Sequence, residues 1–273
     1  MSAGWLQGSR WLCLAAVAVV LAGGCAMPTP PVAPANETRD RVTASDEPDA
    51  QKRARARMEL ASAYFSRGQM TTALDQVKLA IAADPLYGEA FNLRGLIYSN
   101  LGDLALAEES FRRALQLNAR DADAMHNYGW FLCQHKRYGE SSAHFNQALA
   151  VPQYRGASRT LLAHGVCQAF AGQLAEADAT LSRAYELDPS NPFTGTNLSE
   201  VLYRRGEFER ARFYIRRVNG LPDVTNAQTL WLAARIEHKL GNRQGALEFG
   251  NQLRNRFPNA PEAAAFSRGA FDD

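Results

Sequence analysis

Cysteine and histidine are the residues of this chain that could carry nucleophilic or metal-binding chemistry. The five histidines, at positions 126, 135, 144, 164 and 238, never stand four residues apart, the spacing that puts two metal ligands on one helix face. The sequence contains no Gly-x-Ser-x-Gly turn, phosphate-binding glycine loop, His-Glu-x-x-His motif or Cys-x-x-Cys pair. We therefore predict no catalytic residue, metal site, cofactor or small-molecule substrate, and interpret each histidine as a surface or packing residue.

Cys25 follows a segment that has the layout of an export signal. Residues 1–24 hold one cation and no acid, an apolar run of 11 residues and then small residues. A run of that length is well short of the roughly 20 residues that span a bilayer as a helix. Leu-Ala-Gly-Gly-Cys25 resembles the bacterial lipobox, although Ala22 stands where Leu is usual. The resemblance implies that Cys25 is acylated and that the leader is removed; the alternative is an ordinary cleaved signal followed by an incidental cysteine.

Acylation would anchor the protein, since several acyl chains hold a protein on a membrane more stably than one. In Gram-negative lipoproteins an Asp after the cysteine usually marks the inner membrane. Here that residue is Ala26, so the resemblance implies an outer-membrane, lipid-anchored protein that faces the periplasm. Residues 26–50 contain five prolines and almost no large apolar side chain, which predicts a disordered linker. The predicted organisation is a signal peptide over 1–24, a lipidated Cys and linker over 25–50, and a folded domain over 51–273.

The charges of the chain are balanced and intermixed. The sequence has 30 Lys and Arg residues against 28 Asp and Glu. A nucleic-acid-binding protein should show a clear basic face, so we predict no nucleic-acid partner. The one local excess, from Lys52 to Arg57, is interpreted as a solvated helix face, with contact to anionic headgroups near the tether as the alternative.

From residue 54 onward the sequence repeats with a period of about 34 residues. One turn position is held by Gly68, Gly102, Lys136, Gly172, Gly206 and Gly241. The position five residues after each of these is a small residue in every unit: Ala73, Ala107, Ser141, Ala177, Ala211 and Ala246. Gly95, Gly129 and Gly165 fall within predicted helices, where Gly is about 1 kcal/mol less favourable than Ala. We expect these glycines to admit a closely packed second helix.

This pattern resembles the tetratricopeptide repeat. The second unit carries it almost throughout, in Phe91, Gly95, Tyr98, Gly102, Ala107, Phe111 and Ala114. The resemblance covers approximately residues 54–260 and implies an all-α solenoid of about six helix-turn-helix units forming a right-handed superhelix, in which stacking buries the apolar face of each unit. The pattern departs at Lys136 and Ser141, and two extra residues are expected between Val151 and Gly156.

Cys133 and Cys167 remain once the leader is removed and Cys25 is acylated. An even pair in an exported protein indicates a disulfide. In the repeat frame both cysteines lie on first helices of adjacent units, and a bridge requires their Cα atoms to come within about 7 Å. The alternative is a pair of buried thiols packed as small hydrophobes.

First helices of stacked units line a concave surface, and five positions of each helix are expected to face inward. The partner-binding candidates at these positions are Phe65, Leu96, Trp130, Val166, Phe170, Tyr203 and Trp231. Met58, Asn92, His126, Arg204 and Arg235 complete the stripe. Aromatic and Arg side chains are frequent anchors of protein recognition, which favours a groove for an extended or helical peptide with Trp130 and Phe170 flanking one pocket. The alternative is that a strongly curved solenoid buries part of the stripe itself.

The segment from Met125 to Tyr138, Met-His-Asn-Tyr-Gly-Trp-Phe-Leu-Cys-Gln-His-Lys-Arg-Tyr, provides a closer resemblance. With the run Asn92–Tyr98, the lipobox and six repeats, the chain resembles the type IV pilus biogenesis lipoproteins often called pilotins. Members of that family act in outer-membrane assembly of the pilus secretin or in stabilising the pilus. The resemblance implies a non-enzymatic assembly factor whose partner is the secretin or another pilus component. The alternatives are a general periplasmic scaffold in outer-membrane protein assembly or cell-wall synthesis, and an enzyme whose catalytic set forms across repeats.

Overall fold

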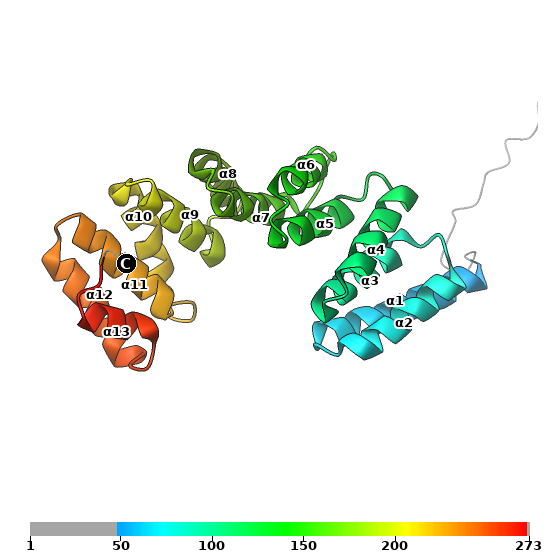
Figure 1. Ribbon diagram of the computed structural model, residues 1–273, viewed down its shortest axis with the longest axis horizontal. Coiled ribbons are helices and arrows are strands. Elements are labelled where there is room, and N and C mark those ends of the chain that lie inside the picture. Colours follow the sequence, from blue (N-terminus) through cyan, green and yellow to red (C-terminus); the bar gives the residue numbers. More distant parts are fainter. Residues whose placement is uncertain (1–47, 272–273) are drawn as a thin grey trace, which may run out of the picture. The chain divides into compact units, whose positions relative to one another are not determined.

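The computed structural model describes residues 48–271, and the predictions for residues 1–47 lie outside this range. The described part folds into 13 α-helices and contains no strand (Figure 1). Their bounds are α1 Asp49–Ser66, α2 Met70–Ala83, α3 Gly88–Leu101, α4 Leu104–Leu117, α5 Ala122–Gln134, α6 Tyr138–Leu149, α7 Ala157–Phe170, α8 Leu174–Leu187, α9 Pro192–Arg204, α10 Phe208–Asn219, α11 Ala227–Lys239, α12 Arg243–Arg256 and α13 Pro261–Ser267. The predicted all-α tetratricopeptide-repeat solenoid is confirmed.

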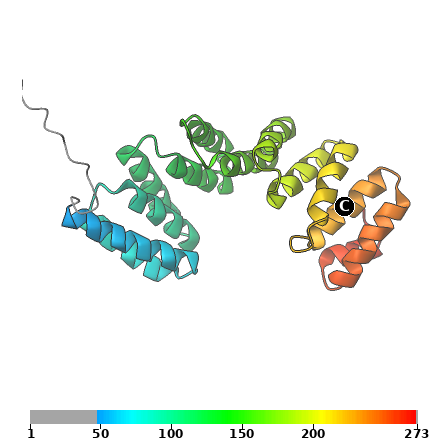
Figure 2. The ribbon, with the colours of Figure 1, turned by 180° about the vertical axis from the view of Figure 1, so that it is seen from behind.

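The helices form six antiparallel pairs, from α1 with α2 to α11 with α12. Each even-numbered helix also packs against the first helix of the next pair, and first helices of neighbouring pairs contact one another (Figures 1 and 2). The short helix α13 packs on α11 and α12 and covers the last pair. Within residues 48–271, no helix has both the length and the apolar character needed to cross a membrane.

The turn inside each pair explains the first repeated position. Gly102 ends α3 with φ 85°, and the N–H of Asp103 donates to the carbonyl of Tyr98 at 3.0 Å. A residue with left-handed backbone dihedral angles at this place ends a helix. Gly adopts this conformation at little energetic cost, because it has no Cβ. Lys136 adopts the same conformation with φ 61°, although it carries a side chain.

Close packing within each pair explains the glycines inside first helices. A Cβ on Gly95 would lie 2.7 Å from Phe111 Cε1, and one on Gly165 would lie 2.6 Å from Leu181 Cγ. In the third pair, Ser141 stands where other units have Ala, and its hydroxyl donates to the carbonyl of Gly129 at 2.7 Å. The expected approach of the second helix is therefore confirmed.

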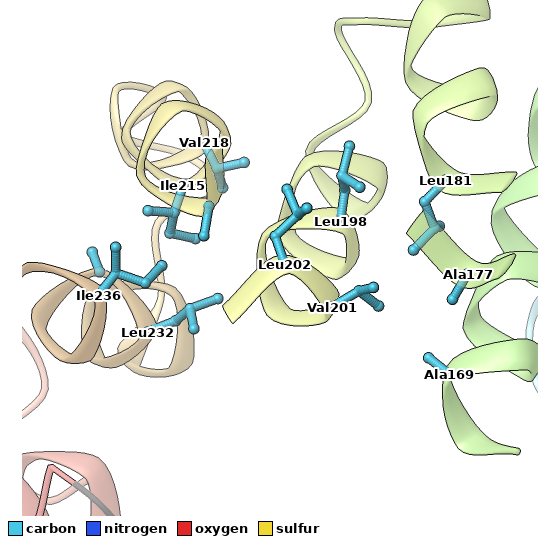
Figure 3. Packing of buried hydrophobic residues seen from close by; sticks show 12 residues of the cluster. Ala169, Ala177, Leu181, Leu198, Val201, Leu202, Ile215, Val218, Leu232 and Ile236 are labelled. Atoms are coloured by element: carbon cyan, nitrogen blue, oxygen red, sulfur yellow. The ribbon is translucent and has the colours of Figure 1, made fainter. Parts of the chain in front are cut away.

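The buried apolar residues link one pair to the next rather than filling each pair separately. The largest such cluster spans α7 to α11 and includes Ala169, Ala177, Leu181, Leu198, Val201, Leu202, Ile215, Val218, Leu232 and Ile236 (Figure 3). Leu202 is fully buried between its neighbours on α10 and α11. A single unit would leave this surface in water, so stacking is the main stabilising contribution.

A buried carboxylate adds a directional link between the fifth and sixth pairs. Glu237 on α11 is 1% exposed and accepts hydrogen bonds from Arg216 Nε at 2.8 Å and from Arg216 Nη2 at 2.6 Å. Asn242 Nδ2 donates to the other carboxylate oxygen at 2.7 Å. Arg216 itself is 51% exposed, so only the carboxylate of this pair is buried, and loss of Arg216 would leave that carboxylate without its main partner.

Candidate protein-binding groove

A groove lies across the first helices of the third, fourth and fifth pairs. It has a volume of about 360 Å³ and is lined by His126, Trp130, Arg159, Leu162, Ala163, Val166, Phe193 and Asn197. We call it the central groove. Its side chains come from α5, α7 and α9, which are neighbours in the stack. Most of its lining is aliphatic or aromatic, as in sites that bind apolar groups.

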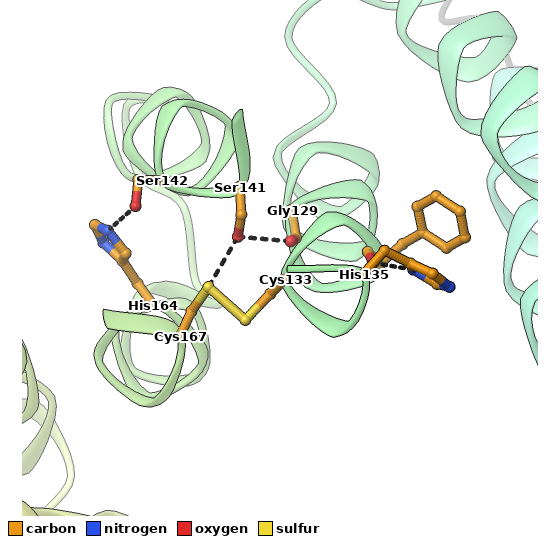
Figure 4. The surroundings of a disulfide bond; sticks show 8 residues. Gly129, Cys133, His135, Ser141, Ser142, His164 and Cys167 are labelled. Atoms are coloured by element: carbon orange, nitrogen blue, oxygen red, sulfur yellow. Dashed lines mark hydrogen bonds between the residues drawn. A yellow bond between two sulfur atoms is a disulfide. The ribbon is translucent and has the colours of Figure 1, made fainter. Parts of the chain in front are cut away.

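The wall formed by α5 and α7 is held by a disulfide. Cys133 on α5 is bonded to Cys167 on α7, with Cα atoms 5.8 Å apart (Figure 4). This distance lies within the usual range for disulfides. Trp130 and Ala163 pack against the buried cluster that contains both cysteines. The bridge therefore ties together the two helices that present Trp130 and Val166.

His126 closes the floor of the groove. Its side chain is 8% exposed, and its Nδ1 shares a hydrogen bond with Thr160 Oγ1 at 2.9 Å. Burial, assisted by the positive charge of Arg159, lowers the pKa of His126 from 6.5 to about 4. The ring is therefore neutral at neutral pH and acts as a packed polar group.

Eight of the twelve residues of the predicted inner stripe line one of three grooves, and Phe65, Phe170, Tyr203 and Arg204 line none of them. His126, Trp130 and Val166 line the central groove. Met58, Asn92 and Leu96 line a second groove over α1, α3 and the start of α5. Trp231 and Arg235 line a third groove over α9, α11 and α13.

The stripe also contributes to the core. Phe65, Leu96, Trp130, Val166, Tyr203 and Trp231 are all half-buried. Tyr203 packs on the large cluster of α7 to α11, and the guanidinium of Arg235 stacks 4.7 Å from its ring centre. The solenoid itself therefore buries part of these side chains, as the alternative interpretation of the stripe expected.

Phe170 requires a correction. It is 63% exposed, but it does not line the central groove with Trp130. The lining residues of α7 run from Arg159 to Val166, so the groove ends about one turn before Phe170, the last residue of the helix. Phe193, 70% exposed at the start of α9, lines the groove instead.

Phe193 was not among the partner-binding residues predicted from the sequence, although its position in the repeat indicated it. It occupies the second position of the first helix in unit five, one of the five positions assigned to the inner face. Extending the spacing rule to every unit would have included it.

The histidines outside the central groove pack or bond locally. The Nδ1 of His135 lies 2.6 Å from the carbonyl of Phe131, and His238 stacks on Phe271 with ring centres 4.2 Å apart. Within residues 48–271, no three His, Cys, Asp or Glu side chains gather as a metal site requires.

Comparison with known proteins agrees with the repeat geometry. The tetratricopeptide repeat pattern matches residues 39–88 and 88–121. Stacked helix pairs with turn glycines define a tetratricopeptide-repeat solenoid protein. The crystal structure of PilW, described as a widely conserved type IV pilus biogenesis factor, is 32% identical, with a TM-score of 0.73 over 78% of this chain and 97% of PilW. The chain belongs to this family of tetratricopeptide-repeat type IV pilus biogenesis proteins.

Two further comparisons concern PilF of Pseudomonas aeruginosa. Its solved structure is 25% identical, with a TM-score of 0.73 over 81% of this chain and 99% of PilF. The sequence of this type IV pilus assembly protein is 26% identical over 211 residues, which cover 77% of this chain and 83% of PilF.

Proposed function

We propose that the chain is a lipid-anchored protein of the outer membrane that promotes type IV pilus assembly by binding, without catalysis, the pilus secretin or another pilus component. Its membership of the pilus biogenesis family supports the role in assembly. The lipobox-like sequence that ends at Cys25 supports the anchor. A general periplasmic scaffold would share these repeats, but it would not explain the likeness to PilW and PilF.

The central groove is the single observation that carries the protein-binding part of the proposal. Phe193 exposes 70% of its surface beside Trp130 and Val166, and it does not belong to the buried cluster formed by its own helix. Exposed aromatic side chains next to a groove are frequent anchors of protein interfaces. A partner segment seated there would remove this apolar surface from water.

The test is capture of the secretin from envelopes with the purified lipoprotein. Phe193→Ala should reduce capture, because it removes an exposed contact and leaves the core untouched. Phe213→Ala is the matched control, since Phe213 is 55% exposed on α10 and does not line the groove. Equal capture by the wild type and Phe193→Ala, with both folded, would remove the central groove from the mechanism.

The anchor has a separate test. Cys25→Ser should release the protein from outer-membrane fractions while the repeat domain keeps its helical circular dichroism spectrum. If the variant still sediments with that membrane after a salt wash, acylation of Cys25 is not the main attachment.

A further inference from the structure

The central groove combines its apolar walls with one formal charge. Among its lining residues, Arg159 is the one ionised side chain, because His126 is neutral at neutral pH and no carboxylate lines the groove. The second groove differs, with Glu89, Asp121 and Asp123 against Arg120. The third is lined by Glu200 and Glu262 against Arg235. The lining of the central groove therefore differs from both neighbours in containing a cation and no carboxylate, and the nearest carboxylate, Asp123, pairs with Arg159 at the rim.

Arg159 is held at the rim of the groove by two acceptors. Its Nη2 donates to Asp123 Oδ1 at 2.6 Å and to Tyr154 Oη at 3.4 Å. Both bonds leave from Nη2, so Nη1 and Nε can each donate a single N–H to a ligand. The side chain is 57% exposed, which makes it accessible to a partner. A carboxylate oxygen can accept a charge-assisted hydrogen bond from either of these groups.

The inserted loop between α6 and α7 supplies one of these acceptors. The two extra residues of the repeat period fall in this loop, where Gln153 has φ 59° and Tyr154 turns back toward α7. A Cβ on Gly156 would lie 2.5 Å from Tyr154 Oη, so the glycine leaves space for the tyrosine. The insertion thus places a hydroxyl beside Arg159.

The same hydroxyl connects the rim to the floor of the groove. Tyr154 Oη lies 3.0 Å from Thr160 Oγ1, which shares a hydrogen bond with His126 Nδ1. Thr160 is fully buried, and Tyr154 Oη also donates to Asp123 Oδ1 at 3.3 Å. This polar network links α5, the inserted loop and α7, and it orders the residues around Arg159 before a ligand binds.

We propose that the central groove selects an extended peptide segment in which a large apolar side chain stands next to a carboxylate. The apolar side chain packs against Trp130, Val166 and Phe193, and the carboxylate accepts a hydrogen bond from Nη1 or Nε of Arg159. This inference rests on the proposed function, since it specifies the chemistry of the partner segment that the groove takes. Charge complementarity with Arg159 is the reason for an acidic rather than a basic segment.

The test uses three acetylated and amidated peptides, Gly-Ala-Phe-Glu-Ala-Gly and its forms with Gln or Lys in place of Glu. Each is titrated into the purified full-length lipoprotein in detergent at low salt, and binding is followed by calorimetry. The Glu peptide should bind about threefold more tightly than the Gln peptide, as expected for a partly exposed ion pair, and the Lys peptide should bind most weakly.

Two variants identify the residue responsible. Arg159→Gln should abolish the preference for Glu over Gln. Arg183→Gln, an exposed arginine on α8 that does not line the groove, should retain the preference. Phe193→Ala should weaken all three peptides together.

Equal affinity for the Glu and Lys peptides, or no binding of any peptide, would overturn this inference. Secretin capture that still depends on Phe193 in that case would leave the proposed function standing. If secretin capture does not depend on Phe193 but the protein still prefers the Glu peptide to the Gln peptide, the proposed function is contradicted and this inference is not.

Discussion

Gly95→Ala tests whether the tight contact between the two helices of a unit is required for stability. The new Cβ would lie 2.7 Å from Phe111 Cε1, 2.8 Å from Cδ1 and 3.0 Å from Cγ. Phe111 is fully buried, and its ring packs 5.6 Å from those of Tyr128 and Phe131. The ring therefore has no free space into which it can move, and α3 and α4 must separate.

Two opposing terms determine the size of the effect. Replacing Gly by Ala within a helix contributes about 1 kcal/mol of stability through helix propensity. Overpacking a filled core costs about 1–3 kcal/mol, and contact below 3.0 Å with a buried ring belongs near the upper end. We expect Gly95→Ala to lower the free energy of unfolding by about 1–2 kcal/mol.

The assay is urea unfolding followed by circular dichroism, with the midpoint and slope fitted for each variant. Gly139→Ala is the matched control, because this residue of α6 has no atom within 4 Å of an added Cβ. The control should be unchanged or more stable by up to about 1 kcal/mol. A Gly95→Ala protein as stable as the control would refute the close-packing argument.

Three further predictions concern the central units. Lys136→Gly should raise the free energy of unfolding by about 0.5–1 kcal/mol. The left-handed backbone at this position costs a residue with a side chain about 1–2 kcal/mol, and the greater conformational entropy of Gly in the unfolded chain offsets part of the gain. A lower urea midpoint for the variant would contradict this prediction. Peptide mass mapping of the unreduced protein should find Cys133 linked to Cys167, and replacing both by Ala should destabilise the fold by up to about 4 kcal/mol for a sequence separation of 34 residues; free thiols at both positions would disprove the bridge. His126 takes up a proton below about pH 6.5 in the unfolded chain, but only near pH 4 in the folded protein. The free energy of unfolding should therefore fall by about 3 kcal/mol as the pH is lowered from 6.5 to 4. An NMR titration of the folded protein that gives His126 a pKa near 6.5 would contradict this prediction.

Much of the fold was predictable because its rules are local. A turn that needs φ near 85° at Gly102, and a helix crossing that leaves no space for a Cβ at Gly95, each restrict the residue at one position. When such positions recur at one period, they reveal the number of units and their boundaries. The positions of Cys133 and Cys167 on neighbouring first helices followed from the same frame.

The central groove depended on how neighbouring first helices are offset along their axes. Sequence spacing placed Trp130 and Phe170 on the inner side of adjacent units, but it could not show that the groove ends a turn before Phe170 and continues to Phe193. That offset results from side-chain packing between units, which no single unit specifies.

The sequence by itself determined the repeat, the number of units and the likeness to pilus biogenesis proteins, because these depend on residue types that recur along the chain. The tertiary structure alone decided that Arg159 is the charge of the central groove and that Tyr154 and Asp123 hold it there. Tyr154 lies in the inserted loop, outside the repeat frame, whereas Asp123 and Arg159 share the second position of their units with Phe193. Their proximity arises from the path of that loop and the packing of α5 against α7, which a period in the sequence does not encode.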